Sequence, residues 1–120
     1  PSQWEQVSSF APDFGPSSEQ VVESLKKGFV HHIDYPMAQA YAAGLIVERC
    51  LIEANSCDAF ALREAAAGLK FSTFYGDFEI DGPTGRQVGR EPLLVQWQYG
   101  EKMVVWPPDR AHATLIYPWR

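Results

Sequence analysis

One stretch of the sequence brings metal-ligating residue types together: His31, His32 and Asp34. Histidine nitrogens and carboxylate oxygens are common ligands of zinc. Adjacent side chains of an extended segment point in opposite directions, so both histidines rarely reach the same ion. We therefore interpret residues 31–35 as a solvated loop and expect no metal site there. The third histidine, His112, is isolated, and we assign it no role.

The cysteines and the closest carboxylates give no signal of catalysis. Cys50 and Cys57 lack Cys-x-x-Cys spacing; two free, buried thiols are the simpler interpretation, and a local disulfide requires the chain to fold back after Ala54. Glu79 and Asp81 could lie on one strand face as paired carboxylates, but a nearby Gly-Pro turn is typical of the solvated face of a hairpin. No serine elbow and no phosphate-binding glycine loop is present. The sequence therefore predicts neither an enzyme nor a cofactor.

Composition places the chain among packed globular proteins with one domain and a modest core. Of its 120 residues 46% are hydrophobic, and the formal net charge is -5. The basic residues are scattered, with Lys26-Lys27 as the only adjacent pair, so we expect no nucleic-acid partner. Pro1 is not a natural translation start, and we expect further sequence upstream of it.

The first predicted helix begins at Ser17 or Ser18 and ends near Gly28. Ser17 and Gln20 have the spacing of a capping box, and the glutamates and lysines of this stretch lie on the side turned to water. Its apolar residues recur at helical spacing: Val21, Val22, Leu25 and Phe29.

The longest predicted helix, residues 36–54, is apolar on every side. A surface helix has one apolar stripe, so a helix that is apolar all round is expected to be buried on most of its circumference. Polar and charged residues within it argue against a membrane span: Gln39, Glu48, Arg49 and Glu53. The rest of the chain contains too little sheet to cover this helix, and we expect its cover to come from sequence outside the chain.

A third, shorter helix and three strands complete the predicted elements. The helix covers residues 59–67, with Asp58 as its N-cap and Gly68 as its end. Strands are predicted at residues 74–80, 93–98 and 102–106, with turns at 81–85 and 99–101. The isolated segment is therefore predicted to be α+β, with three helices followed by an antiparallel β meander. We expect a single segment with three parts: a crossing or linker at 1–16, the helices at 17–70, and the meander and tail at 71–120.

Several short motifs follow one another in order along almost the whole chain. They are Pro1-Ser2-Gln3-Trp4, Asp13-Phe14-Gly15-Pro16-Ser17, Asp34-Tyr35-Pro36, Gln39-Ala40-Tyr41-Ala42-Ala43-Gly44, Phe74-Tyr75-Gly76-Asp77-Phe78-Glu79-Ile80-Asp81, Thr84-Gly85, Leu94-Val95-Gln96-Trp97, Gly100 and Val105-Trp106-Pro107-Pro108. This succession resembles the C-terminal region of ABC-transporter solute-binding proteins of the branched-chain-amino-acid type, which are type I periplasmic binding proteins. The resemblance covers only the C-terminal part of a full-length family member.

The resemblance implies two α/β lobes around a ligand cleft, joined by three crossings of the chain. The three helices would belong to the lobe that also holds the N-terminus of the whole protein. The strand pair around Trp97 and Trp106 would return to the other lobe. A parallel sheet encoded upstream would then cover the helix at residues 36–54, as in doubly wound folds.

The family that the chain resembles captures small solutes, often amino acids or other small carboxylates, and delivers them to an ABC permease in the membrane. This implies an extracytoplasmic location and no chemistry on the ligand. By position, Tyr35, Met37 and Gln39 match the cleft wall, and Trp4 lies near a crossing segment. The helix N-terminus there also suits an anionic ligand group, because the end of its dipole is positive. Aromatic residues near loop or helix entrances can line such a cleft or pack in the core: Trp4, Phe10, Phe14, Tyr35 and Tyr41.

Two other functions remain open. An exposed apolar helix suits a protein-interaction module that docks through this helix, and the two-lobed fold also serves as the ligand-sensing domain of receptors. An isolated chain would leave the back of the helix at residues 36–54 uncovered. We therefore predict that it forms homo-oligomers, for example by exchanging elements between copies.

Overall fold

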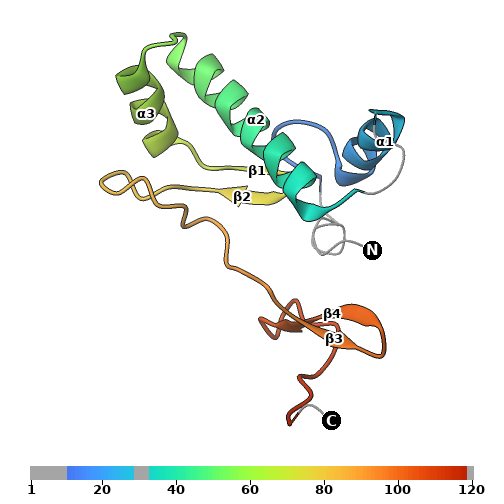
Figure 1. Ribbon diagram of the computed structural model, residues 1–120. Helices are drawn as coiled ribbons and strands as arrows, with labels where there is room; N and C mark the ends of the chain where they lie inside the picture. Colours follow the sequence, from blue (N-terminus) through green and yellow to red (C-terminus); the bar gives the residue numbers. More distant parts are fainter. Residues whose placement is uncertain (1–10, 29–32, 119–120) are drawn as a thin grey trace. The chain divides into compact units, whose positions relative to one another are not determined.

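A computed structural model describes residues 11–28 and 33–118 of the chain (Figure 1). In these ranges three helices are followed by two small antiparallel sheets of two strands each, which confirms the predicted α+β class. The chain divides into two compact units, residues 1–90 and residues 91–120. The predictions for Trp4, Phe10, Phe29, His31 and His32 lie outside the described residues.

The first helix, α1, spans Ser18–Gly28, as its capping signals predict. The capping box is formed in both directions. The Ser17 backbone N–H donates to Gln20 Oε1 at 2.9 Å, and the Gln20 N–H donates to Ser17 Oγ at 3.4 Å. Val21 lies on the inner face and is fully buried, while an exposed ion pair joins Glu23 and Lys27 on the outer face.

The long helix, α2, spans Tyr35–Ala54 and is capped at both ends by short polar residues. Asp34 is its N-cap, and its carboxylate accepts a hydrogen bond from the Tyr35 N–H at 2.7 Å. Asn55 ends the helix in the left-handed conformation, with φ of 46°, and its N–H donates to the Leu51 carbonyl. Asparagine tolerates this conformation better than most residues, which explains why the helix ends here.

Only one face of α2 is buried within its own unit. The buried residues are Ala38, Ala42, Leu45 and Cys50. The expectation that α2 is buried on most of its circumference concerns the complete protein and stays a prediction; in the free chain Val47 and Ile52 are 56% and 58% exposed. The expectation that its apolar back stays uncovered is confirmed. No helix among the described residues meets the length and hydropathy that a membrane crossing needs.

The third helix, α3, spans Ala59–Gly68 and follows α2 after a short turn (Figure 1). The Asp58 carboxylate accepts hydrogen bonds from the backbone N–H groups of Phe60 and Ala61, both at 3.0 Å. The predicted N-cap and the predicted end at Gly68 are both confirmed. Its close neighbour is α2, against which it packs with its half-buried Leu62 and Ala66 facing the core.

The first sheet is a hairpin of β1, Phe71–Thr73, and β2, Gly76–Phe78, with Ser72 opposite Asp77. The predicted strand at residues 74–80 is confirmed for Gly76–Phe78, but Phe74 and Tyr75 form the turn that follows β1. Phe74 is fully buried in the core, and Gly76 has φ of +127°, a conformation that favours glycine. Burial of the Phe74 ring therefore fixes the position of the turn, although the alternation of apolar and polar residues in the sequence continues through it.

Two clusters of buried side chains form the core of the first unit. One contains Val21, Ala38, Ala42, Leu45 and Phe74. The other contains Cys50, Leu69, Phe71 and Phe78. Phe14 packs against both clusters and meets the Phe71 ring edge-on, with centroids 6.0 Å apart. Tyr41 packs against Phe74 in the same way at 5.7 Å, so Phe14 and Tyr41 are core residues in this structure.

The second unit is built on a hairpin of β3, Leu94–Gln98, and β4, Glu101–Trp106. Tyr99 and Gly100 have positive φ of 53° and 84°. Two consecutive positive values form a two-residue turn whose twist matches that of the strands. The predicted turn and the antiparallel return of the chain are both confirmed.

Candidate functional site

The predicted ligand wall lies on the first two turns of α2. Tyr35 is 49% exposed, Gln39 is exposed and Met37 is half-buried. Residues four apart share a helix face, so Tyr35 and Gln39 lie on one side and Met37 on another. None of these three residues lines the pocket described below, and Trp4 lies outside the described residues.

The N-terminal end of α2 already carries a carboxylate. Asp34 accepts the hydrogen bond of Tyr35, and its backbone carbonyl accepts those of Met37 and Ala38. A negative group at this position matches the positive end of the helix dipole. Pro36 has no N–H, and the N–H groups of Tyr35, Met37 and Ala38 are already bonded to Asp34, so the first four residues of α2 leave no free N–H for an anionic ligand group.

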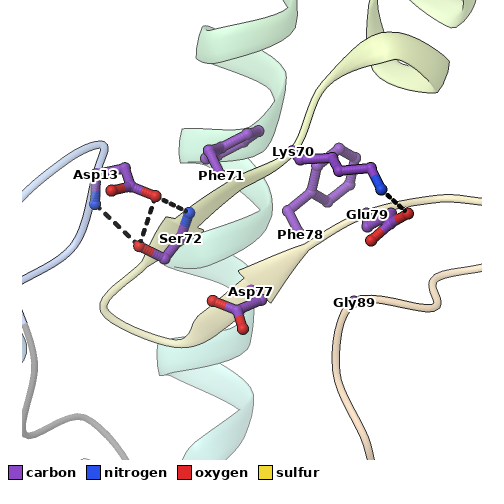
Figure 2. A pocket seen from close by; sticks show the side chains of 8 residues that line it. All are labelled: Asp13, Lys70, Phe71, Ser72, Asp77, Phe78, Glu79 and Gly89. Carbon is purple, nitrogen blue, oxygen red and sulfur yellow. Dashed lines mark hydrogen bonds and ion pairs between the residues drawn. The ribbon is translucent and has the colours of Figure 1, made fainter.

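An open pocket of about 530 Å³ lies elsewhere in the first unit, over the polar face of the β1–β2 hairpin (Figure 2). Side chains alternate between the two faces of a strand, and the register therefore sets Ser72 and Asp77 on one face. The residues that line the pocket are Asp13, Lys70, Phe71, Ser72, Asp77, Phe78, Glu79 and Gly89. The aromatic residues belong to the core beneath and Ser72 is also buried, so the accessible polar groups are those of Asp13, Lys70, Asp77 and Glu79.

One wall of the pocket is a network between Asp13 and Ser72. The Asp13 carboxylate accepts hydrogen bonds from the Ser72 N–H at 2.9 Å and from its hydroxyl at 3.0 Å. The Asp13 N–H donates to Ser72 Oγ at 3.0 Å, and the Phe14 N–H donates to the Ser72 carbonyl. Asp13 and Phe14 thus bond to the backbone at the outer edge of β1, as a third strand would.

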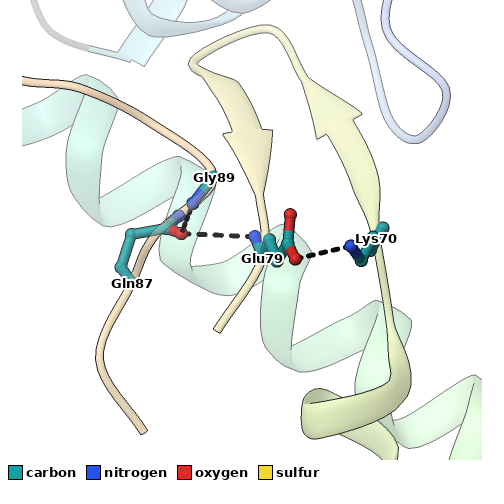
Figure 3. Close-up of polar contacts among 4 residues, drawn as sticks. All are labelled: Lys70, Glu79, Gln87 and Gly89. Carbon is teal, nitrogen blue, oxygen red and sulfur yellow. Dashed lines mark hydrogen bonds and ion pairs between the residues drawn. The ribbon is translucent and has the colours of Figure 1, made fainter. Parts of the chain in front are cut away.

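The opposite wall contains Lys70, Glu79 and Gly89, and Gln87, which does not line the pocket, binds the last two (Figure 3). Lys70 Nζ lies 2.6 Å from Glu79 Oε1, in an ion pair whose lysine side chain is 73% exposed. Gln87 Oε1 accepts hydrogen bonds from the backbone N–H groups of Glu79 and Gly89, at 3.2 and 2.8 Å. A side-chain amide thus completes the outer edge of β2.

The pocket offers polar groups of both signs to a solute. The Asp77 carboxylate points into it, and no hydrogen bond or ion pair engages that carboxylate within the described part of the chain (Figure 2). The Ser72 hydroxyl is engaged by Asp13. Among the described residues no three metal-ligating side chains converge.

Most of these residues are not predicted from the sequence. Glu79 and Asp81, which could form a carboxylate pair on one strand face, have separate partners: Glu79 pairs with Lys70, and Asp81 accepts hydrogen bonds from Thr84. The signal that could have found the pocket is Gly76, since a turn just before it sets β1 against β2. The Asp13–Ser72 network joins positions 59 apart and has no local signal.

The two cysteines are free, which settles the question of a disulfide in this structure. The expectation that both are buried holds for Cys50 and is wrong for Cys57, which is exposed beside α3. Burial raises the pKa of the Cys50 thiol, and the positive charge of Arg49 opposes this in part. Neither cysteine lines the pocket.

Comparison with models of protein families, with curated proteins and with solved structures finds no match to this chain.

Proposed function

We propose that this chain is a segment of an extracytoplasmic solute-binding protein of an ABC importer. The observation that carries the proposal is that α2 packs on one side and presents an apolar stripe on the other. This outer stripe consists of Ala40, Ala43, Gly44, Val47 and Leu51, all of them exposed. A helix of this kind suits the layer between other helices and a parallel sheet.

The outer stripe is energetically significant. Burial of apolar surface contributes about 25 cal/mol per Å². Covering on the order of 200–400 Å² would therefore add several kcal/mol, against a total stability of about 5–15 kcal/mol for a domain. A chain that leaves this much stabilisation unused is well explained as one part of a larger body.

The division of the chain supports the same proposal. Residues 1–90, with the three helices, form one compact unit, and residues 91–120 form another. In a protein with two lobes, the chain must pass from one compact unit to another where it crosses between the lobes. We propose that the solute is an amino acid or another small carboxylate, that an ABC permease receives it, and that Tyr35, Met37, Gln39 and Trp4 contribute to the cleft wall.

The test is to express the complete reading frame that contains this chain and to titrate it with amino acids and small carboxylates. A bound solute at 100 times its Kd stabilises the folded state by about 2.7 kcal/mol, which raises Tm by several degrees. Replacement of Gln39 by alanine should weaken binding, while Glu19→Ala on the exposed side of α1 should not. If no solute in either class raises Tm, the proposal is wrong.

A second candidate function is a protein-interaction module, and the exposure of large apolar residues favours it. Phe60 at the start of α3 is 81% exposed, and Ile52 at the end of α2 is 58% exposed. The complete reading frame separates the two functions. Hydrogen exchange should be slow at the outer stripe of the full-length monomer if a sheet covers it, and fast if the stripe awaits a separate partner.

A further inference from the structure

Two glutamines of β3 hold the end of the chain through its backbone. Gln96 Nε2 donates to the Ile116 carbonyl at 2.9 Å, and the Ile116 N–H donates to Gln96 Oε1 at 3.0 Å. Gln98 Nε2 donates to the Thr114 carbonyl and to Gln96 Oε1, both at 2.8 Å. We call residues 112–116 the strap.

The geometry at Gln96 is that of strand pairing. A carboxamide has one N–H donor side and one carbonyl acceptor, as a peptide group has, so it can pair with a residue as a neighbouring strand does. Gln96 and Gln98 are two apart and share a strand face. Together they present two amide groups in a row, and Gln98 is only 6% exposed.

The strap is recognised through main-chain atoms. Besides the glutamine contacts, the N–H groups of His112 and Ala113 both donate to the Val104 carbonyl, at 2.8 and 3.3 Å. Of the strap residues, His112, Thr114 and Leu115 are exposed, whereas Ala113 and Ile116 are half-buried. The strap bends at His112 and Ala113, and the glutamines contact only Thr114 and Ile116 beyond these bends. Recognition through main-chain atoms tolerates many sequences, as in strand addition to a sheet edge.

We propose that Gln96 and Gln98 form a clamp for extended polypeptide, that the strap fills this clamp within the same chain, and that a separate extended peptide binds there when the strap is released. The strap competes with a separate peptide for the clamp, and it is favoured because its attachment to the same chain gives it a high effective concentration. A free peptide therefore binds measurably only when the strap is weakened.

The first experiment tests whether the glutamines hold the strap. Gln96→Glu keeps an acceptor for the Ile116 N–H but removes the donor to the Ile116 carbonyl and places a negative charge against it. Hydrogen exchange at Ile116 and His112 should rise about tenfold in this variant, the change that loss of one hydrogen bond produces. Exchange at β3 and β4 should stay slow.

The control is Gln39→Glu, which makes the same change on the exposed surface of α2 and should leave strap exchange unaltered. Unchanged exchange at Ile116 in Gln96→Glu would overturn the clamp. Equal loss of protection at β3 and β4 would also overturn it, because the strap would then be an inseparable part of the hairpin.

The second experiment tests binding of a separate peptide to the full-length chain. Ile116→Pro removes the N–H that Gln96 accepts and leaves both glutamines in place. A fluorescent peptide with the sequence of residues 111–118 should bind this variant at least about tenfold more tightly than the wild type, as measured by anisotropy. Binding should be lost in the double variant with Gln96→Glu. Equal binding by the single and double variants, or no binding by either, refutes the proposal.

Discussion

At the scale of single residues, side chains take the place of strands at both edges of the β1–β2 hairpin. Asp13 covers β1, and Gln87 covers β2. An unpaired strand edge leaves backbone groups without partners and invites association with other chains. Here a carboxylate and a carboxamide supply the hydrogen-bond partners that the backbone groups at these edges lack.

Two glycines of the first unit should respond to alanine in opposite directions. A Cβ at Gly89 would lie 2.7 Å from the Glu79 backbone nitrogen and 3.0 Å from the Phe78 carbonyl carbon, so Gly89→Ala should destabilise the fold by about 1–3 kcal/mol. A Cβ at Gly44 meets nothing within 4 Å, and Gly44→Ala within α2 should stabilise by about 0.5–1 kcal/mol. Urea unfolding of both variants checks this, and an equal sign of the two changes contradicts it.

The cysteines should differ in reactivity towards a thiol reagent. Cys57 is exposed and should be modified rapidly in the folded chain, whereas Cys50 is buried and its raised pKa keeps it as the less reactive thiol. One thiol per chain should therefore react before unfolding, and Cys57→Ser should remove that phase. Rapid modification of a second thiol in the native state would contradict the burial of Cys50.

Stability should fall at alkaline pH because of Cys50. The unfolded chain releases this proton near the ordinary pKa of 9.0, while the folded chain holds it to higher pH. Above about pH 9 the folded state therefore binds more protons, and the unfolding free energy decreases as pH rises. Cys50→Ala should remove this part of the pH dependence in urea titrations, although the variant is less stable overall.

At the scale of elements, helix ends are determined by capping groups within a few residues of each other. Asp58→Ala should lower the unfolding free energy by about 0.5–2 kcal/mol, because two N–H groups at the start of α3 lose their acceptor. Asp109→Ala is a matched control, since its weak ion pair with Arg110 at 3.9 Å is exposed. Thermal unfolding of both variants measures the difference, and equal Tm values would show that the cap contributes nothing.

The elements differ in how far the sequence predicted them. The N-cap of α3 at Asp58, the capping box of α1 and the turn at Tyr99 and Gly100 depend on neighbouring residues, and local patterns predicted them. The β1–β2 hairpin does not follow from local pattern. Its turn at Phe74 exists because the ring reaches a core built by α1 and α2, and residues at some distance in the sequence decide that.

At the scale of the whole molecule, the outer stripe of α2 predicts that the free chain associates with itself. Ala40, Ala43 and Gly44 permit close approach of a second helix, and Val47 and Leu51 supply larger apolar side chains to bury. Light scattering should show a homo-oligomer at micromolar concentration. Val47→Lys combined with Leu51→Lys should give a monomer, whereas Glu48→Lys on the edge of the stripe should not. A wild-type monomer at all concentrations would contradict this prediction.

The sequence by itself determined the order of the elements, the ends of the helices and the α+β class, because capping groups and side-chain periodicity act over a few residues. Only the tertiary structure decided which face of α2 is buried, where β1 turns into β2, and which polar groups surround the pocket. Asp13 meets Ser72, and Gln96 meets Ile116, across long stretches of chain. Such contacts form only after side chains distant in the sequence are buried together and bring the backbone segments close to one another. A pattern of neighbouring residues cannot predict them.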